Sequence, residues 1–460
     1  MSNENNFPNS YRFIIKSKTN TMKTKKMYLV LFSFITLSST FINCRNDDDK
    51  VILEEGETPN QQDKTVNQAP DDFELIAVID GATDVDVIPN FLWNAAVDPD
   101  GDSISYELFV DENNNPTTSL ANTINETNFT LEERLPLNQD LFWKVVAIDS
   151  EGNTTSSETF SFTTRNLHIP ETPVTASAAF SERRDHASVV FDNKMWVIGG
   201  YDGFSHLNDI WLSTDGETWT QVTAEAPFHK RRFHSTVVFD NKIWVMGGHN
   251  GSDILTDIWQ SSDGENWTLV TGGLPFIISY DQSVIAFQNK LWVIGSGSGP
   301  AKSMNTIWQS SDGETWTSVD SQITFTDRFG FATLVFDNKI WIIGGNGAGA
   351  ENFNTPLNDT WQSSDGKIWN QVNANTLFSG RKGHTSVVFD DKMWIIGGFD
   401  GSSRVNDIWQ SADGETWTQV IKEGPYTGRL EYTPISFNNK IWIIGGSTGS
   451  ALLNDVWSMD

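Results

Sequence analysis

Seven histidines and a large excess of carboxylates are the side chains of this sequence that could support chemistry. No histidine pair is accompanied by the cysteine pair of a zinc-site motif; the histidines are His168, His186, His206, His229, His234, His249 and His384. The phosphate-binding loop, the G-x-S-x-G turn and the H-E-x-x-H motif are all missing from the sequence. The single cysteine, Cys44, excludes an intramolecular disulfide framework and a cysteine-rich zinc site. These residues therefore favour a binding protein and predict no catalytic set.

One short run of carboxylates has a spacing that hard cations accept. Asp98, Asp100 and Asp102 alternate with Pro99 and Gly101, and carboxylate oxygens are the ligands that calcium prefers. The spacing of an EF-hand loop is absent, because glycine stands fourth in the run and no glutamate follows at the twelfth position. Two interpretations stay open: a calcium site, or an ordinary surface turn of an acidic protein. No other cofactor is predicted.

The overall charge limits the kinds of partner. The chain has 460 residues with 60 acidic and 31 basic side chains, and its formal net charge is −29. Nucleic-acid binding needs a basic surface that displaces counterions, so DNA and RNA are excluded as partners. A hydrophobic content of 38% is enough for a folded core, and the length predicts two or three domains.

The N-terminal segment has the features of a secretion signal. Residues 1–43 contain six Lys or Arg against one acid, and residues 27–37 are largely apolar but short for a membrane span. The end of the segment, Phe41-Ile42-Asn43-Cys44, resembles the lipobox of bacterial lipoproteins, with Phe41 and Asn43 departing from the usual residues. The resemblance implies that Cys44 carries a lipid that anchors the protein in a membrane. A free Cys44 after an ordinary signal is the alternative.

An acidic tether is predicted to follow the anchor. Residues 44–69 are polar and lack aromatic side chains, so they cannot repay the entropy lost on ordering. The acidic residues 47–49 resemble the surface-export signal of Bacteroidetes lipoproteins, and a solvated linker is the alternative. Together with the lipobox, this resemblance implies that the protein lies in the outer membrane or at the cell surface.

Residues 70–166 are predicted to form a small β-sandwich. Short runs with alternating apolar and polar residues are separated by turn signals such as Asp80-Gly81 and Glu151-Gly152. The run from Phe142 to Gly152, together with Trp93, resembles a fibronectin type III domain of the immunoglobulin-like class. A cadherin-like sandwich is the near alternative.

The remaining residues, 171–460, contain six copies of one repeat. Its most regular part is a tryptophan followed by a β-branched or apolar pair and usually two glycines, with successive tryptophans 48, 48, 49, 53 and 48 residues apart: Trp196, Trp244, Trp292, Trp341, Trp394 and Trp442. Each copy has four strand-like runs, and the central runs are apolar at consecutive positions, which predicts sheets covered on both faces. Four-stranded sheets repeated around an axis form a β-propeller. The predicted fold class is therefore all-β.

The repeat unit Arg-x-x-His, apolar strand, Gly-Gly and two tryptophans resembles the kelch repeat. Five copies keep the arginine, and three keep the histidine, as His186, His234 and His384. The resemblance implies a six-bladed kelch propeller in which the repeated Arg and His side chains hold strand ends together. Residues 172–184 match residues 220–232, which predicts that residues 171–176 form the outer strand of the last blade and close the ring.

The residues that vary between repeats are the candidate ligand contacts. The first set follows the glycine pairs, in loops that a kelch propeller would place on one face: Tyr201, His249, Asn346, Phe399 and Arg404. The second set occupies one equivalent position near the predicted channel mouth: Asp185, Asp281 and Glu431. Ordinary loop decoration is the alternative for each residue.

The sequence thus predicts a monomeric, lipid-anchored binding module for a glycan or a protein. An enzyme similar to the kelch-type N-acetylneuraminate mutarotases is the alternative, because mutarotation needs only modest acid–base help. A scaffold for a larger surface assembly is a third. Galactose oxidase chemistry is excluded, because its Cys–Tyr crosslink would need a cysteine beyond Cys44.

Overall fold

The computed structural model describes residues 66–276, 283–296, 306–321, 323–347 and 355–460. Every regular element in these ranges is a β-strand, which confirms the all-β prediction for them. The same ranges contain no helix of the length and apolar character that a membrane crossing requires. The predicted signal, Cys44 and the tether up to residue 65 lie outside the described residues. Residues 66–460 form one compact unit.

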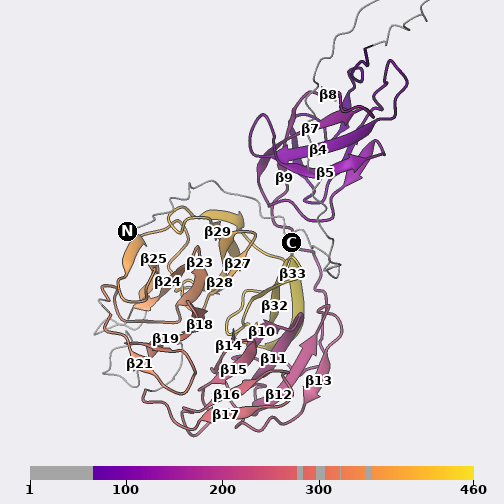
Figure 1. Cartoon of the computed structure of the whole chain (residues 1–460). Helices are drawn as coiled ribbons and strands as arrows, with labels where there is room; N and C mark the ends of the chain where they lie inside the picture. Colours follow the sequence, from indigo (N-terminus) through magenta and orange to yellow (C-terminus); the bar gives the residue numbers. More distant parts are fainter. Residues whose placement is uncertain (1–65, 277–282, 297–305, 322, 348–354) are drawn as a thin grey trace, which may run out of the picture. The chain divides into compact units, whose positions relative to one another are not determined.

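The first part of this unit has two β-sheets (Figure 1). One sheet contains β1 (Leu75–Ala77), β3 (Asn90–Trp93) and β6 (Asn128–Thr130). The other contains, in spatial order, β2 (Ala82–Val85), β9 (Phe160–Thr164), β7 (Asp140–Ile148), β4 (Ser105–Asp111) and β5 (Ser119–Ile124), with β8 (Thr154–Ser156) also pairing with β7. Burial alternates along β7, as the sequence pattern predicted. Trp93 from one sheet and Trp143 from the other share a buried core, so the sheets pack face to face.

Each sequence repeat of the second part corresponds to one antiparallel sheet. The first three sheets contain β10 (Ala187–Phe191), β11 (Lys194–Tyr201), β12 (His206–Ser213) and β13 (Thr220–Thr223); β14 (Ser235–Phe239), β15 (Lys242–Met246), β16 (Ile258–Ser261) and β17 (Thr268–Thr271); and β18 (Ser283–Phe287), β19 (Lys290–Ser296), β20 (Thr306–Ser310) and β21 (Thr317–Ser318). Figure 1 shows these sheets side by side in sequence order.

The other sheets follow the same order. They contain β22 (Arg328–Phe329), β23 (Ala332–Phe336), β24 (Lys339–Gly347), β25 (Thr355–Ser363) and β26 (Asn370–Asn373); β27 (Thr385–Phe389), β28 (Lys392–Phe399), β29 (Arg404–Ser411) and β30 (Thr418–Ile421); and β31 (Ile435–Phe437), β32 (Lys440–Ser447) and β33 (Leu452–Met459). In each sheet the strand that contains the repeated tryptophan is buried along its apolar run, because its neighbours cover both faces.

Two kinds of turn set the direction of each sheet. In repeat 1, β10 and β11 are joined by Asp192 and Asn193, whose φ angles are 49° and 53°. Positive φ at both positions is the two-residue hairpin geometry that Asp and Asn tolerate. Because β11 begins at Lys194 and ends at Tyr201, this turn lies at one end of the sheet and the loop at residues 202–205 lies at the other. We call the end with the 202–205 loop, and its equivalents in the other repeats, the loop face.

Neighbouring repeats are joined by a tryptophan that packs against a glycine. The Trp196 ring of repeat 1 lies where a side chain on Gly264 of repeat 2 would stand. The same contact joins Trp442 of repeat 6 to Gly216 of repeat 1, so the last and first repeats are also neighbours. No described glycine covers Trp394 of repeat 5 in this way. That ring instead shares a buried cluster with the linker residues Leu167 and Ile169 and with sandwich residues that include Leu137.

The segment before repeat 1 pairs with the last strand of the chain. Thr175 and Val456 exchange two backbone hydrogen bonds of 3.2 and 2.8 Å. His168 and Asp460 exchange two more, of 2.7 and 3.1 Å, and Arg183 donates its backbone N–H to Leu453. The segment therefore occupies the place of a fourth strand beside β33, in agreement with the match between residues 172–184 and 220–232.

Candidate binding face

A buried arginine–aspartate pair recurs in five repeats. Arg231 is fully buried and donates two hydrogen bonds to the carboxylate of Asp257, of 3.0 and 2.8 Å, and one of 2.8 Å to the carbonyl of Gly247. Trp259 donates its indole N–H to the same carboxylate. The other pairs are Arg183–Asp209, Arg328–Asp359, Arg381–Asp407 and Arg429–Asp455.

In these five repeats the pair joins the segment that leads into the sheet to the third of the antiparallel strands or to the residue just before it. Burial alone would raise the pKa of Asp257, but the hydrogen bonds and charge of Arg231 keep that pKa below its ordinary value. Repeat 3 carries Ser279 and Thr306 at the two positions, so it has lost both partners together. Losing only one would leave a buried unpaired charge. The repeated arginines are structural, as the sequence predicted, and are excluded as ligand contacts.

The repeated histidines are structural as well. His186, His234 and His384 are buried, and burial and the adjacent arginine lower the pKa of each imidazole to about 3. His234 packs against the glycine pair of the preceding repeat, within contact distance of a side chain placed on Gly199. These imidazoles are neutral spacers at neutral pH.

The loop face is built by backbone bridges next to the buried arginines. The residue after each arginine pairs with the residue after the glycine pair, as in Arg184 with Tyr201 and Arg232 with His249. The corresponding pairs in repeats 4, 5 and 6 are Phe329–Asn346, Lys382–Phe399 and Leu430–Ser447. Tyr201, His249, Asn346 and Phe399 therefore do occupy one equivalent position, on which the side chains differ.

The residue two positions after the repeated arginine links neighbouring sheets. Asp185 donates its backbone N–H to Glu431, at 2.9 Å, and Phe233 donates to Asp185, at 3.1 Å. Asp185, Phe233 and Glu431 have φ angles of 53°, 57° and 64°, in the left-handed region that non-glycine residues rarely adopt. Gly330 and Gly383 take the same position in repeats 4 and 5. Asp185 and Glu431 thus lie together, as predicted, while Asp281 lies outside the described residues.

Two arginines from neighbouring repeats converge on Tyr201. The guanidinium carbons of Arg184 and Arg232 lie 5.5 and 5.0 Å from the centre of the Tyr201 ring, the geometry of a cation–π contact. The buried carboxylate of Asp185 lies 3.8 Å from a nitrogen of each guanidinium. Arg184 also donates a hydrogen bond of 3.1 Å to Glu431.

Arg232 is the arginine of this cluster that is available to a ligand. Within the described part of the chain its guanidinium makes no hydrogen bond, and its Nε is buried without a partner. Its side chain is 21% exposed. A partly exposed guanidinium with unsatisfied donors is suited to a carboxylate or another planar anion.

Two imidazoles extend the cluster. The ring of His206 lies 5.3 Å from Tyr201 and 6.0 Å from His249. Burial, followed by the electrostatic effects of Arg232 and His249, lowers the pKa of His206, so that ring is neutral at neutral pH. His249 accepts a hydrogen bond from the backbone N–H of Gly251 through Nδ1. In its neutral form this imidazole therefore carries its proton on Nε2.

Sequence reasoning missed Phe204 and Arg232. Phe204 is 94% exposed on the loop that follows Tyr201, and an exposed phenylalanine beside a charged cluster is typical of a contact surface. Arg232 stood in the sequence beside the structural Arg231, and the doubled arginine also occurs at residues 183–184. The doubled arginine was the sequence feature that could have indicated a second, non-structural arginine.

Two predicted ligand contacts have different roles in the structure. Asn346 is fully buried, so it contributes no exposed side chain to the loop face. Arg404 packs its guanidinium against Gly449 of the next repeat, at the place where a side chain on that glycine would stand. His206 makes the equivalent contact with Gly251, so this position joins neighbouring repeats. Phe399 keeps a cation–π contact with Lys382, at 5.7 Å.

The predicted calcium residues are only partly brought together. Asp98 and Asp102 approach each other in the loop before β4, but their third neighbour is Asp149, which follows β7. Asp100 is exposed and accepts the backbone N–H of Gln68. Asp100 is thus not a member of this group of three carboxylates.

Comparison with known proteins bears on the repeat region. Residues 147–345 and 281–460 match the family model described as the KLHDC2/KLHL20/DRC7 Kelch-repeats domain. The chain is also 53% identical over 36 residues to the leucine-zipper-like transcriptional regulator 1 homolog of Drosophila melanogaster. That alignment spans 8% of this chain and only 4% of the relative's length. The family match and the repeated sheets agree: the chain belongs to the kelch-repeat family.

Proposed function

We propose that the protein is a binding module that recognises a partner protein through an acidic group at the loop face. The observation that carries this proposal is the Arg232 guanidinium, which is partly exposed, lies over Tyr201 and has unsatisfied hydrogen-bond donors. Phe204 supplies an exposed apolar contact on the adjoining loop. A carboxylate beside an apolar side chain is the chemistry that such a surface recognises.

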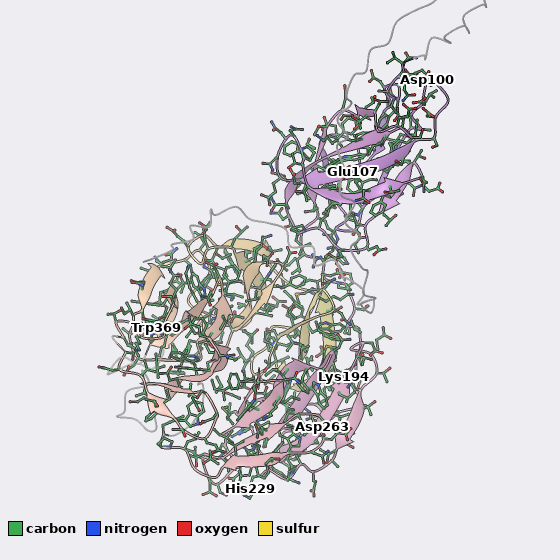
Figure 2. All side chains as sticks on the ribbon, in the orientation of Figure 1. Asp100, Glu107, Lys194, His229, Asp263 and Trp369 are labelled. Carbon is green, nitrogen blue, oxygen red and sulfur yellow. The ribbon has the colours of Figure 1, made fainter. Side chains whose placement is uncertain are left out.

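Selection of a random peptide library on the full chain tests this function. We expect the selected peptides to carry an acidic residue and to bind at least about tenfold more weakly to Arg232→Ala. The matched control is Lys194→Ala. Lys194, labelled in Figure 2, is 34% exposed and pairs with Asp192 at the opposite end of the sheet. Selected peptides that lack acids, or that bind Arg232→Ala as tightly as the unchanged chain, would contradict the proposal.

An enzyme acting on an acidic sugar is the second candidate function. The His206–His249 pair beside Arg232 favours it, because imidazoles can move the proton that anomer exchange requires. The test is magnetisation-transfer NMR of N-acetylneuraminate anomers with the full chain. Faster exchange that disappears in His249→Ala would support the enzyme, and an unchanged rate would remove this candidate.

The architecture and location complete the proposal. The six repeats form one six-bladed ring, the preceding sandwich is fibronectin-like, and Cys44 carries a lipid that places the protein at the outer membrane or cell surface. The Trp442–Gly216 contact supports the ring, and the basic residues before the apolar run support the secretion signal. Metabolic labelling with palmitate tests the anchor: label is expected on the unchanged chain and not on Cys44→Ala.

A further inference from the structure

Three carboxylates from two loops meet at one end of the sandwich. One oxygen from each of Asp98, Asp102 and Asp149 lies within 4.8 Å of the others. Figure 2 labels Asp100, whose chain segment connects the first two, among the loops at that end. Sequence spacing alone had grouped Asp100 with Asp98 and Asp102, whereas the fold replaces it with a residue 47 positions beyond Asp102 in the sequence.

The strand register explains why these residues meet. β4 and β7 pair antiparallel with Ser105 opposite Ile148, so the start of one strand lies beside the end of the other. Asp102 precedes β4 and Asp149 follows β7 directly, so both residues lie at the same end of these two strands. Asp98 lies four residues before Asp102, and its Oδ1 accepts the backbone N–H of Asp102, at 3.1 Å. The loop is thereby folded back toward Asp149.

The hydrogen bonds of the three carboxylates are unequal. Asp149 accepts N–H groups from Glu151, Asn153 and Asn67, the largest number among the three. Asp102 accepts one hydrogen bond, from the Ser150 hydroxyl. Asp98 is only 8% exposed, and its Oδ2 is buried without a hydrogen-bond partner. A buried carboxylate oxygen with no donor is costly and points to a missing positive partner.

No side-chain cation supplies that positive charge among the described residues. None of the ion pairs formed there by Lys, Arg or His includes Asp98, Asp102 or Asp149.

We propose that Asp98, Asp102 and Asp149 bind one calcium ion. Calcium lies about 2.3–2.6 Å from its oxygen ligands, so two oxygens on opposite sides of one ion are separated by about 4.6–5.2 Å. Three oxygens within 4.8 Å of one another therefore fit around a single ion. Magnesium needs shorter distances and a near-octahedral set, which ligands from two separate loops are poorly suited to provide.

The ion would also fix the segment that enters the sandwich. Asn67 donates its side-chain N–H to Asp149, and Gln68 donates its backbone N–H to Asp100. Residues 67 and 68 thus lie against the same two loops that hold the ion. Calcium would stiffen residues 67 and 68 against these two loops. This site is independent of the loop face and of the function proposed for it.

Calorimetry and sensitised terbium luminescence on the full chain, stripped with EDTA, test the site. We expect one calcium ion per chain, with Kd of about 10⁻⁴–10⁻³ M or tighter, and much weaker binding of magnesium. Asp102→Asn and Asp98→Asn should each weaken calcium binding at least about tenfold, because each removes a charge and keeps an oxygen acceptor. Asp100→Asn is the matched control and should bind calcium within about threefold of the unchanged chain.

Thermal unfolding separates a metal site from a purely structural cluster. In EDTA, Asp102→Asn should melt at the same or a higher temperature than the unchanged chain, because one of three neighbouring negative charges is gone. In the presence of calcium, Asp102→Asn should melt at a lower temperature than the unchanged chain. Absence of calcium binding by the unchanged chain would overturn the proposal, and so would loss of binding in Asp100→Asn but not in Asp102→Asn. Destabilisation of Asp102→Asn in EDTA without any effect of calcium would also overturn it.

Discussion

At the scale of the residue, the repeated histidine shows how a potentially chemical side chain becomes structural. His186, His234 and His384 sit behind the buried arginines and against the glycine pair of a neighbouring repeat. Other repeats place Phe331 and Tyr432 there, and Tyr432 donates its hydroxyl to the carbonyl of Ile396. Phe331 has no titratable group, so the position does not depend on an imidazole.

This role predicts a pH dependence of stability. The folded-state pKa of each histidine, about 3, lies below the ordinary value of 6.5, so the unfolded chain binds protons first as the pH falls. Stability is complete above pH 6.5 and falls below it, by up to about 1.4 kcal/mol per pH unit for each histidine. Replacing all three histidines by Phe should flatten the free energy of unfolding between pH 6.5 and 4.5.

Chemical denaturation at several pH values measures this slope. The window ends at pH 4.5 because the carboxylates titrate below it and act in the same direction. The single variant His229→Phe is the control, since His229 lies outside the repeat position and is exposed. Equal slopes for the triple variant and the unchanged chain would show that the imidazoles are not the source.

The candidate site was only half predictable at this scale. Spacing placed Tyr201, His249 and Phe399 at one equivalent position, because repeats are aligned by their glycine pairs. Spacing does not show which of these side chains is buried, so the full burial of Asn346 was missed. The carboxylate group likewise depended on the pairing of β4 with β7, a contact between strands that are distant in the sequence.

At the scale of the element, the Asp-Gly turn between the third and fourth strands has two functions. The sequence predicted it as a hairpin device, which needs positive φ at the glycine, and Gly264 has φ of 79°. The structure adds the second function, because the Trp196 ring of the preceding repeat packs directly against this glycine. Each turn therefore closes its own sheet and covers the core of its neighbour.

Substitution of the turn glycine separates the two functions. Gly264→Ala should cost about 1 kcal/mol for the backbone and a further 1–3 kcal/mol, because the Trp196 ring must move. Gly81→Ala is the matched control: its φ is 71° and no atom lies within 4 Å of the added Cβ. Denaturant unfolding should show the larger loss for Gly264→Ala. Equal losses would mean that the contact with Trp196 adds nothing.

At the scale of the whole molecule, the repeats are joined into a ring by a segment that is distant in sequence. The sequence predicted this closure because residues 172–184 match the end of repeat 1, and Thr175 does pair with Val456. The cover over Trp394 was not predictable. It is provided by Leu167, Ile169 and Leu137, which belong to no repeat and so have no sequence equivalent to compare.

A single proline tests the closing segment. Thr175→Pro removes the N–H that donates to Val456 and should lower the melting temperature of the repeat region by several degrees. Thr172→Pro is the control, since it lies outside the bridge and beside an existing proline. Differential scanning calorimetry measures both. A melting temperature that is unchanged in Thr175→Pro would show that this pairing does not hold the ring.

The pairing of residues 168–183 with β33 also sets an order of events during synthesis. The segment leaves the ribosome before any repeat, whereas its partner strand is made after all the others. The first sheets can form as they emerge, but the last sheet stays incomplete until β33 is translated. Until then the growing chain keeps an open strand edge at each end of the repeat region, where a chaperone or a second nascent chain would have access.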